Sequence, residues 1–494
     1  MVVNRSQSRL LSDGSGRSLD LSQFERTLEV EPIFACEGRV VRLAGIGLEA
    51  VLPSPVQGQI VEIDRMNHSP LTCEIIGFDS GKVFLMPLGE LEGVRPGAPV
   101  KIISGGLRVN TGDFLIGRVV DGLGRPIDGK GELPRGQKTP IDRHGPNPVT
   151  RPLIDEPMFT GIRAIDTLLT IGKGQRVGIF SGSGVGKSII LGMIARYTRA
   201  DVNVIALIGE RGREVREFIE RDLGEEGLKR SVVIVATSNE PALVRLRGAL
   251  TATAIAEYFR DSGSDVLFMM DSLTRFALAG REVGLASGEP PATRGYPPSV
   301  FGLIPKLLER AGRSPEGSIT GLYSVLVEGD DLAEPVSDIA RATLDGHFVL
   351  SRDLADQGHY PAIDILSSIS RVMRRVISGE QNDLAQCLRE HLASFKEMED
   401  LINIGAYQRG TNPRTDEAID RIDAIRKFLR QDMDESSDFE DALEKLRIVA
   451  GSKVPQKKPT GAIEPPPSRM KSQTAVADAH NPKAGKLPPG AYET

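Results

Sequence analysis

The sequence predicts an α/β core of parallel strands and alternating helices, preceded by a small β-barrel and followed by a helical domain. Three observations support this fold class: short β-rich runs fill residues 38–103, continuous apolar runs alternate with helical segments up to about residue 370, and only helical spacing follows. Continuous apolar runs are what a parallel sheet buried on both faces requires. The length of 494 residues also favours several domains over one core.

Residues 1–27 are predicted to be a flexible arm, because they are polar and Ser12–Gly16 interrupts them. The alternative is an amphipathic docking helix on Leu21, Phe24 and Leu28. The β-barrel is predicted over residues 28–103. Its strand candidates are Arg39–Leu43, Gln59–Ile63, Glu74–Phe78 and Lys82–Met86.

The α/β core is predicted over residues 104–370. A β-rich passage, Phe114–Val120, and a Gly/Pro-rich connector over residues 121–150 lead to a helix expected at Thr160–Leu168. The buried strands expected after it are Arg176–Phe180, Val202–Ile208, Val232–Ala236, Val266–Met270 and Leu322–Val327. Ile189–Ala195 is expected to be a buried helix.

The stretch between the first of these strands and that helix has the composition of a phosphate-binding loop. It consists of Ser181, Gly182, Ser183, Gly184, Val185, Gly186, Lys187 and Ser188. Glycines let successive backbone N–H groups point at phosphate oxygens beside the positive end of a helix. Lys187 would reach the β- and γ-phosphates, and the Ser188 hydroxyl would bind Mg²⁺. Ser181 stands where the usual pattern begins with glycine.

Acidic residues follow three of the predicted strands: Glu210, Asp271 and Glu328. Ligands of parallel sheets bind beyond the carboxyl ends of the strands, so Asp271 is a candidate to hold Mg²⁺ through water. Glu210 is the candidate general base for the attacking water. Its alternative is a structural ion pair with Arg211 or Arg213. Charge developing on a γ-phosphoryl group also requires a cation, for which Arg371 and Arg275 are the candidates.

Residues 371–450 are predicted to form a helical domain, and residues 451–494 a disordered tail rich in proline and lysine. One apolar helix face runs from Leu384 to Ile402 and another from Ile419 to Leu429, and Asp438 is a candidate cap for a third helix that ends near Ala450.

The bulk composition excludes several classes of protein. A net charge of −6 gives no general attraction to nucleic acid, and only Phe34, Phe78 and Phe84 could stack bases on the barrel. Cys36, Cys73 and Cys387 are far apart, which indicates reduced thiols rather than disulfides or a zinc site. No signal peptide or membrane-spanning run is expected.

Long ordered motifs resemble the rotary ATPase α/β family, and more closely the ATPases of bacterial type III protein export, in their flagellar form. The likeness extends from about residue 28 to 450. It rests on the phosphate-binding loop and on Gly172–Arg176, Leu191–Asp201, Gly209–Val215, Asp271–Ala277, Pro290–Ser299 and Pro361–Ser370. The resemblance implies a RecA-like nucleotide domain between the barrel and the helical domain, Mg²⁺ as cofactor and ATP as substrate.

The resemblance also implies roles for single residues. Lys187 and Ser188 match the phosphate and Mg²⁺ residues, Glu210 the catalytic carboxylate and Asp271 the acid at a strand end. Arg371 matches the arginine given to the ATP of the neighbouring subunit, and Tyr360 the aromatic residue that packs on adenine.

The partners implied are the other subunits of a homo-hexamer, a stator-like regulatory protein on the N-terminal arm, a central stalk protein, export chaperones with their cargo, and the membrane export gate. The implied location is the cytoplasm, peripherally at the inner membrane of the flagellar base. Synthase β subunits carry an acidic loop where this chain has Tyr407–Arg414, which speaks against a proton-driven synthase subunit.

The main interpretation is therefore an Mg²⁺-dependent ATPase that energises flagellar protein export. A virulence-type secretion ATPase is the nearest alternative. A hexameric RNA translocase shares the barrel and the RecA-like domain, but the acidic charge and the few aromatics weigh against it. A catalytically inactive subunit conflicts with the presence of Lys187, Glu210, Asp271 and Arg371.

Overall fold

The computed structural model describes residues 37–327 and 334–451, and two short paired strands, β1 (Leu11–Ser12) and β2 (Ser18–Leu19). Apart from those strands, the predicted arm over residues 1–27 lies outside the described residues. So do residues 28–36 of the predicted barrel, Cys36, Glu328 and the predicted tail from residue 452 onward. Within the part that is described, no helix is both long and apolar enough to cross a membrane.

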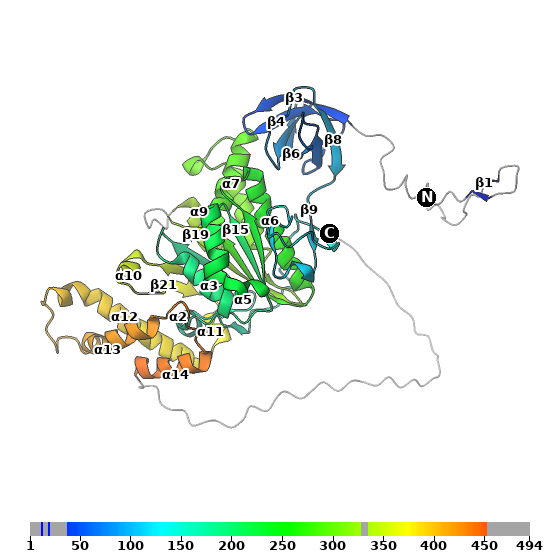
Figure 1. Ribbon diagram of the computed structural model, residues 1–494. Helices are drawn as coiled ribbons and strands as arrows, with labels where there is room; N and C mark the ends of the chain where they lie inside the picture. The colour runs from blue at the N-terminus through cyan, green and yellow to red at the C-terminus, as the bar shows by residue number, and fades with distance from the viewer. Residues whose placement is uncertain (1–10, 13–17, 20–36, 328–333, 452–494) are drawn as a thin grey trace, which may run out of the picture. The chain divides into compact units, whose positions relative to one another are not determined.

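Six antiparallel strands close into the predicted N-terminal barrel, in the order β3-β4-β7-β6-β5-β8 (Figure 1). They are β3 (Glu37–Ala44), β4 (Gly47–Val51), β5 (Ile60–Ile63), β6 (Leu71–Asp79), β7 (Lys82–Pro87) and β8 (Pro99–Ser104). Alternate side chains such as Val61, Ile63, Cys73 and Ile75 point inward and fill the barrel. Burial raises the pKa of the Cys73 thiol to about 12, as expected for an inert reduced cysteine.

The connector after the barrel corrects one predicted strand. Phe114 and Leu115 lie in the short helix η1 (Asp113–Leu115), and only β10 (Val119–Asp121) joins the central sheet. Gly117 adopts a φ of 80°, a conformation that ends an extended run. Nearby, β9 (Arg108–Thr111) pairs with β11 (Gln137–Pro140), and further along the chain β12 (Pro157–Met158) pairs with β13 (Ile171–Gly172).

The central sheet has the strand order β10-β16-β15-β17-β19-β14-β20-β21, with β18 beside β19. All pairs along this order are parallel except β20 with β21, and β18 is antiparallel to β19. The strands are β14 (Arg176–Ser181), β15 (Val202–Ile208), β16 (Ser231–Ala236), β17 (Asp265–Asp271), β18 (Gly312–Arg313), β19 (Ser318–Leu326), β20 (Gly346–Leu350) and β21 (Ile363–Ser370). All five predicted core strands are present; β20 and β21 were not among them.

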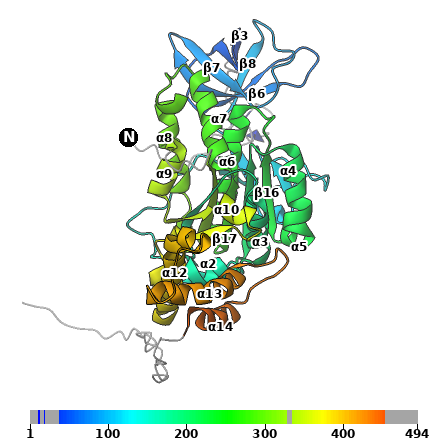
Figure 2. The ribbon, with the colours of Figure 1, turned by 90° about the vertical axis from the view of Figure 1, so that its left-hand side faces the viewer.

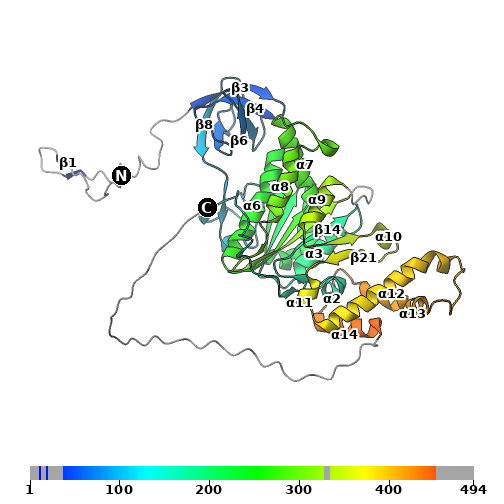
Figure 3. The ribbon, with the colours of Figure 1, turned by 180° about the vertical axis from the view of Figure 1, so that it is seen from behind.

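Helices cover both faces of this sheet, which explains its continuous apolar strands (Figures 2 and 3). Along β15, Val204 and Ala206 face one hydrophobic cluster, whereas Ile205 and Leu207 face the other. The first cluster includes α6 (Ala242–Asp261), α7 (Leu273–Ala286), α8 (Pro298–Leu308) and α9 (Pro335–Thr343). The second includes α2 (Arg163–Leu168), α3 (Lys187–Tyr197) and side chains of the C-terminal helices. The remaining short helices are α4 (Gly212–Glu217), η2 (Phe218–Leu223), α5 (Gly224–Lys229), η3 (Thr293–Gly295), α10 (Arg352–Asp356) and α11 (Met373–Val376).

Three helices form the predicted helical domain: α12 (Gly379–Asn403), α13 (Pro413–Leu429) and α14 (Phe439–Ala450). Each begins at a capping side chain, Ser378, Asn412 or Asp438, which accepts a backbone N–H of the first turn. The cap predicted at Asp438 is thus confirmed. The amide of buried Gln431 ties this domain to the core, because it donates to the Gly161 carbonyl and accepts from the Arg163 N–H, both at 2.7 Å.

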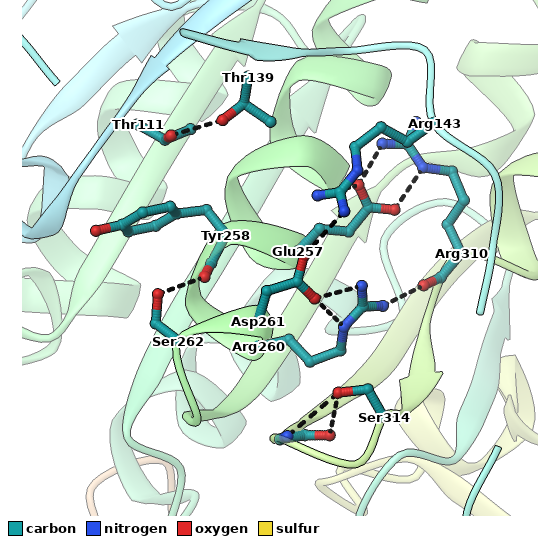
Figure 4. A network of polar contacts seen from close by, with 11 residues as sticks. Thr111, Thr139, Arg143, Glu257, Tyr258, Arg260, Asp261, Ser262, Arg310 and Ser314 are labelled. Atoms are coloured by element: carbon teal, nitrogen blue, oxygen red, sulfur yellow. Dashed lines mark hydrogen bonds and ion pairs between the residues drawn. The ribbon is translucent and has the colours of Figure 1, made fainter. Parts of the chain in front are cut away.

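A buried ion pair joins α6 to the segment before β18 (Figure 4). Arg310 donates to both carboxylate oxygens of Glu257, at 2.8 and 2.9 Å, and to the Ile141 carbonyl at 2.8 Å. Only 2% and 1% of the two side chains are exposed, so each charge depends on the other. Arg143 lies beside the pair, 3.5 Å from Glu257 and 2.9 Å from Asp261.

We predict that Glu257→Gln destabilises the protein by about 3–5 kcal/mol, because it leaves the buried Arg310 guanidinium without its counter-charge. Differential scanning calorimetry would show a melting temperature lower by several degrees. Glu226→Gln makes the same chemical change at an exposed pair with Lys229 and should stay within about 0.5 kcal/mol of wild type. Equal melting temperatures for all three proteins would contradict this interpretation.

Candidate active site

The predicted phosphate-binding loop lies between β14 and α3, at the carboxyl end of the sheet. Gly184 and Gly186 have φ angles of 80° and 87°, a left-handed conformation that favours glycine and turns the chain into the helix. Lys187 and Ser188 open α3, so the backbone N–H groups of its first turn face the loop. Arg352 of α10 donates to the Ser183 carbonyl at 3.1 Å and supports the loop from outside.

Asp271 ends β17, two strands away from the loop, and meets Lys187 there. The Lys187 ammonium donates to Asp271 Oδ1 at 2.5 Å, and the Ser324 hydroxyl of β19 donates to the same oxygen at 2.5 Å. Asp271 is only 6% exposed, so the lysine provides the charge that its carboxylate needs. The structure therefore brings together two residues that are 84 positions apart in the sequence.

Glu210 follows β15 and reaches the same ammonium, with its Oε1 3.7 Å from Lys187 Nζ. Its ion-pair partner is Arg275 of α7. The alternative in which Glu210 pairs with Arg211 or Arg213 is wrong: Arg211 pairs with Glu214 and Arg213 with Glu217.

The surroundings of Glu210 favour its protonated form. Burial, and secondly the charge of Asp271, raise the pKa of Glu210 to about 7, although Lys187 and Arg275 act in the opposite direction. A carboxyl group with a pKa near neutrality is well matched to proton transfer at physiological pH. Such a shift, at a buried carboxyl group beside a phosphate-binding loop, is typical of catalytic residues.

The position of Arg275 depends on Gly209. Gly209 has a φ of 73°, and a Cβ there would lie 2.8 Å from Cδ of Arg275. Only glycine lets the arginine pass close enough to pair with the adjacent Glu210. Of the two candidate cations, Arg275 thus belongs to the same subunit's site.

Arg371 lies at the other end of the sheet. Its backbone N–H donates to the Asp345 carbonyl at 3.0 Å, and the Asp345 N–H donates to the carbonyl of Arg176, the first residue of β14. The phosphate-binding loop begins at the opposite end of β14, about 16 Å away for a six-residue strand. The exposed Arg371 side chain donates to the Arg341 carbonyl at 3.2 Å. It therefore does not serve the loop of its own chain.

A pocket of about 420 Å³ lies next to the phosphate-binding loop and the first turn of α3. Its lining includes Gly186, Ile189, Met193, Tyr360 and Met433. A Cβ on Gly186 would lie 3.4 Å from the Tyr360 ring, which is 44% exposed and so can stack on a flat ligand. The pocket has the apolar lining and the position next to the loop that a nucleobase requires.

The oxygen donors at the loop fit Mg²⁺. Ser188 is exposed in the first turn of α3, and the Asp271 carboxylate is bound to Lys187, the residue before it. No group of three or more His, Cys, Asp or Glu side chains placed to hold a metal occurs among the described residues.

Sequence reasoning missed three parts of this site. Ser324 interrupts the apolar run of β19, a signal that could have found it. Nothing in the sequence around Arg352 indicates its contact with the loop. The wall of the base pocket at Arg430–Met433 comes from the connection between α13 and α14, which only the tertiary fold brings to the loop.

Comparison with known proteins agrees with this geometry. The family described as "ATP synthase alpha/beta family, nucleotide-binding domain" matches residues 161–370. The family described as "T3SS EscN ATPase C-terminal domain" matches residues 377–448.

The chain is 50% identical over 428 residues to a flagellum-specific ATP synthase of Bacillus subtilis, covering 86% of this chain and 98% of that protein. It is 49% identical to a type 3 secretion system ATPase of Xanthomonas euvesicatoria, covering 86% of this chain and 96% of that one. Among solved structures, the assembled ATPase EscN of enteropathogenic E. coli in complex with its central stalk EscO superposes with a TM-score of 0.78 at 44% identity, covering 84% of this chain and 100% of EscN. The chain therefore belongs to the ATP synthase alpha/beta family, among its flagellum-specific and type III secretion ATPases.

Proposed function

We propose that this protein is the Mg²⁺-dependent ATPase of a flagellar type III export apparatus, which energises chaperone release, unfolding and export of flagellar proteins. The observation that carries the proposal is the division of the catalytic groups between the two ends of the sheet: Lys187, Asp271 and Glu210 at one end and Arg371 at the other. A virulence-type secretion ATPase is the second candidate, because a relative of that name is nearly as similar as the flagellar one.

In the proposed site, the loop N–H groups and Lys187 bind the phosphates of ATP, and Tyr360 packs on the adenine. Ser188 and Asp271 would hold Mg²⁺, the latter through water; when bound, the ion offsets the charge of the phosphates. The phosphates compete with the two carboxylates for Lys187. Lys187 would then move from Asp271 and Glu210 to the phosphates.

Glu210, freed from Lys187, accepts a proton from water while the water oxygen bonds to the γ-phosphorus. The bond to the β-phosphate oxygen breaks, giving ADP and phosphate. Charge on the transferring group requires a cation at its far side. Arg275 is engaged with Glu210, so Arg371 of a neighbouring subunit supplies this cation.

A site shared between subunits implies a closed ring, for which we propose a homo-hexamer. The structure of EscN with its central stalk supports a stalk partner for this chain as well. By the same family argument, we propose a stator-like protein on the N-terminal arm, chaperones with cargo, and the membrane export gate as further partners. The location would be the cytoplasm, peripherally at the inner membrane.

Lys187→Ala should abolish nucleotide binding, because it removes the charge that faces the β- and γ-phosphates. Titration with a fluorescent ATP analogue measures this directly. Lys229→Ala, at an exposed pair with Glu226, is the matched control and should bind as wild type does. Retained affinity in Lys187→Ala would rule out the proposed role of the loop.

Hydrolysis should decline as the pH falls below about 7, because Glu210 then carries a proton and cannot act as a base. The profile of kcat/KM against pH reports this group in the free enzyme. Glu210→Gln should keep ATP binding, lower turnover by ~10²-fold or more and lose this limb of the profile. Glu217→Gln, on the neighbouring exposed helix α4, should leave the profile unchanged. A Glu210→Gln enzyme with normal turnover would show that the residue is structural.

Arg371→Ala should bind ATP normally but hydrolyse it ~10³-fold more slowly or worse, as when an arginine supplied in trans is removed. For wild type, specific activity should rise with protein concentration as subunits associate, and sedimentation on the same samples should show the assembly. Normal turnover in an Arg371→Ala assembly would contradict a shared site.

A further inference from the structure

Arg389 of α12 contacts β21, the strand that Arg371 directly follows. Its guanidinium donates to the Ile365 carbonyl at 2.7 Å and to the Ser368 carbonyl at 3.5 Å, both on β21. It also donates to the carbonyl of Leu168, the last residue of α2, at 2.9 Å. One side chain of the helical domain thus bridges two elements of the nucleotide-binding domain.

The place where Arg389 binds β21 is an irregular part of the strand. β21 ends the strand order of the sheet, so it has a neighbouring strand, β20, on one side only. Regular pairing with β20 holds Ile363 and Asp364 at one end and Ile369 and Ser370 at the other, with a register shift between. Ile365 and Ser368 lie in this irregular middle. Asp364 and Ser368 bridge this segment from within, since Asp364 accepts the Leu366 N–H and Ser368 accepts the Val349 N–H of β20, both at 2.9 Å. Arg389 adds hydrogen bonds to the same segment from the helical domain.

Arg371 follows this supported segment directly. A cavity of about 650 Å³ is lined by Arg371, Arg389 and residues of β21 and α12 between them. Ser370 is fixed from the other side, because its hydroxyl donates to the Thr170 carbonyl at 2.8 Å and accepts from the Gln175 amide at 3.1 Å. The end of α2 and the strand β21 are consequently held together, and Arg389 of α12 hydrogen-bonds to both.

We propose that Arg389 is a positioning residue: it couples α12 to β21 and so places Arg371 for the nucleotide of the neighbouring subunit. The proposal rests on the function proposed above for Arg371. α12 is 25 residues long and extends about 21 Å beyond Arg389 toward Asn403. A displacement of that helix by a partner would therefore be felt at Arg371.

The first test compares Arg389→Ala and Arg389→Lys with wild type in the full-length protein. Misplacing a catalytic group by about 1 Å can cost ~10²-fold, so we expect kcat to fall ~10- to 100-fold in Arg389→Ala. Arg389→Lys keeps the charge but not the fork geometry and should give an intermediate kcat. KM, affinity for a fluorescent ATP analogue and assembly by sedimentation should stay within about twofold. Arg409→Ala removes an exposed arginine of the same domain, one that pairs with Asp420 of α13, and should have wild-type kcat.

A double-mutant cycle then asks whether Arg389 acts through Arg371. In an Arg371→Ala background, measured in single turnover at high enzyme concentration, Arg389→Ala should cause no further loss. A further loss there, an unchanged kcat in the single variant, or a loss of nucleotide affinity or assembly in Arg389→Lys would each overturn the proposal. If Arg371→Ala alone keeps full turnover, it is instead the shared site of the proposed function that fails.

Discussion

The site depends on one ammonium group held between buried carboxylates. Lys187 contacts Asp271 and Glu210, and Arg275 balances the second acid, so two cations face two anions in a largely buried space. Unpaired, any of these charges would be costly to bury. In the proposed reaction, a phosphate group that attracts Lys187 would withdraw this cation from both carboxylates at once. Nucleotide binding and the charge environment of Glu210 would thus be linked through Lys187.

The parallel sheet places the phosphate-binding loop and Arg371 of one chain at its opposite ends. Its carboxyl end gathers the loop, Glu210 and Asp271, because successive parallel strands all end there. After β20 the chain passes through α10 and returns along the antiparallel strand β21 to the opposite end of the sheet, where Arg371 follows. The fold itself separates the arginine from its own loop by the length of β14. Assembly of subunits is the simplest way for the loop and an arginine to meet at one nucleotide. The helical domain contacts β21, the strand before Arg371, through Arg389.

Much of this could be predicted from the sequence, and the exceptions have physical reasons. Continuous apolar runs revealed β14 to β17 and β19, since those strands are buried on both faces. β20 and the edge strand β21 include partly exposed residues between their buried ones, so the signal of a continuous apolar run was absent. Lys187, Glu210 and Asp271 could be named from local motifs, whereas the pairing of Glu210 with Arg275 depends on Gly209 and on α7. The contacts of Arg389 span 221 positions and leave no local pattern.

Mixing two inactive variants is the most direct test of whether two subunits share one active site. Lys187→Ala lacks the loop lysine but keeps Arg371, and Arg371→Ala has the opposite defect. When subunits of the two are dissociated, mixed and reassembled, some interfaces combine an intact loop with an intact arginine. If the active site is shared, the mixture should hydrolyse ATP at a rate that neither variant reaches alone. A mixture that assembles, with both kinds of subunit shown in one complex, yet stays as inactive as its components would contradict it.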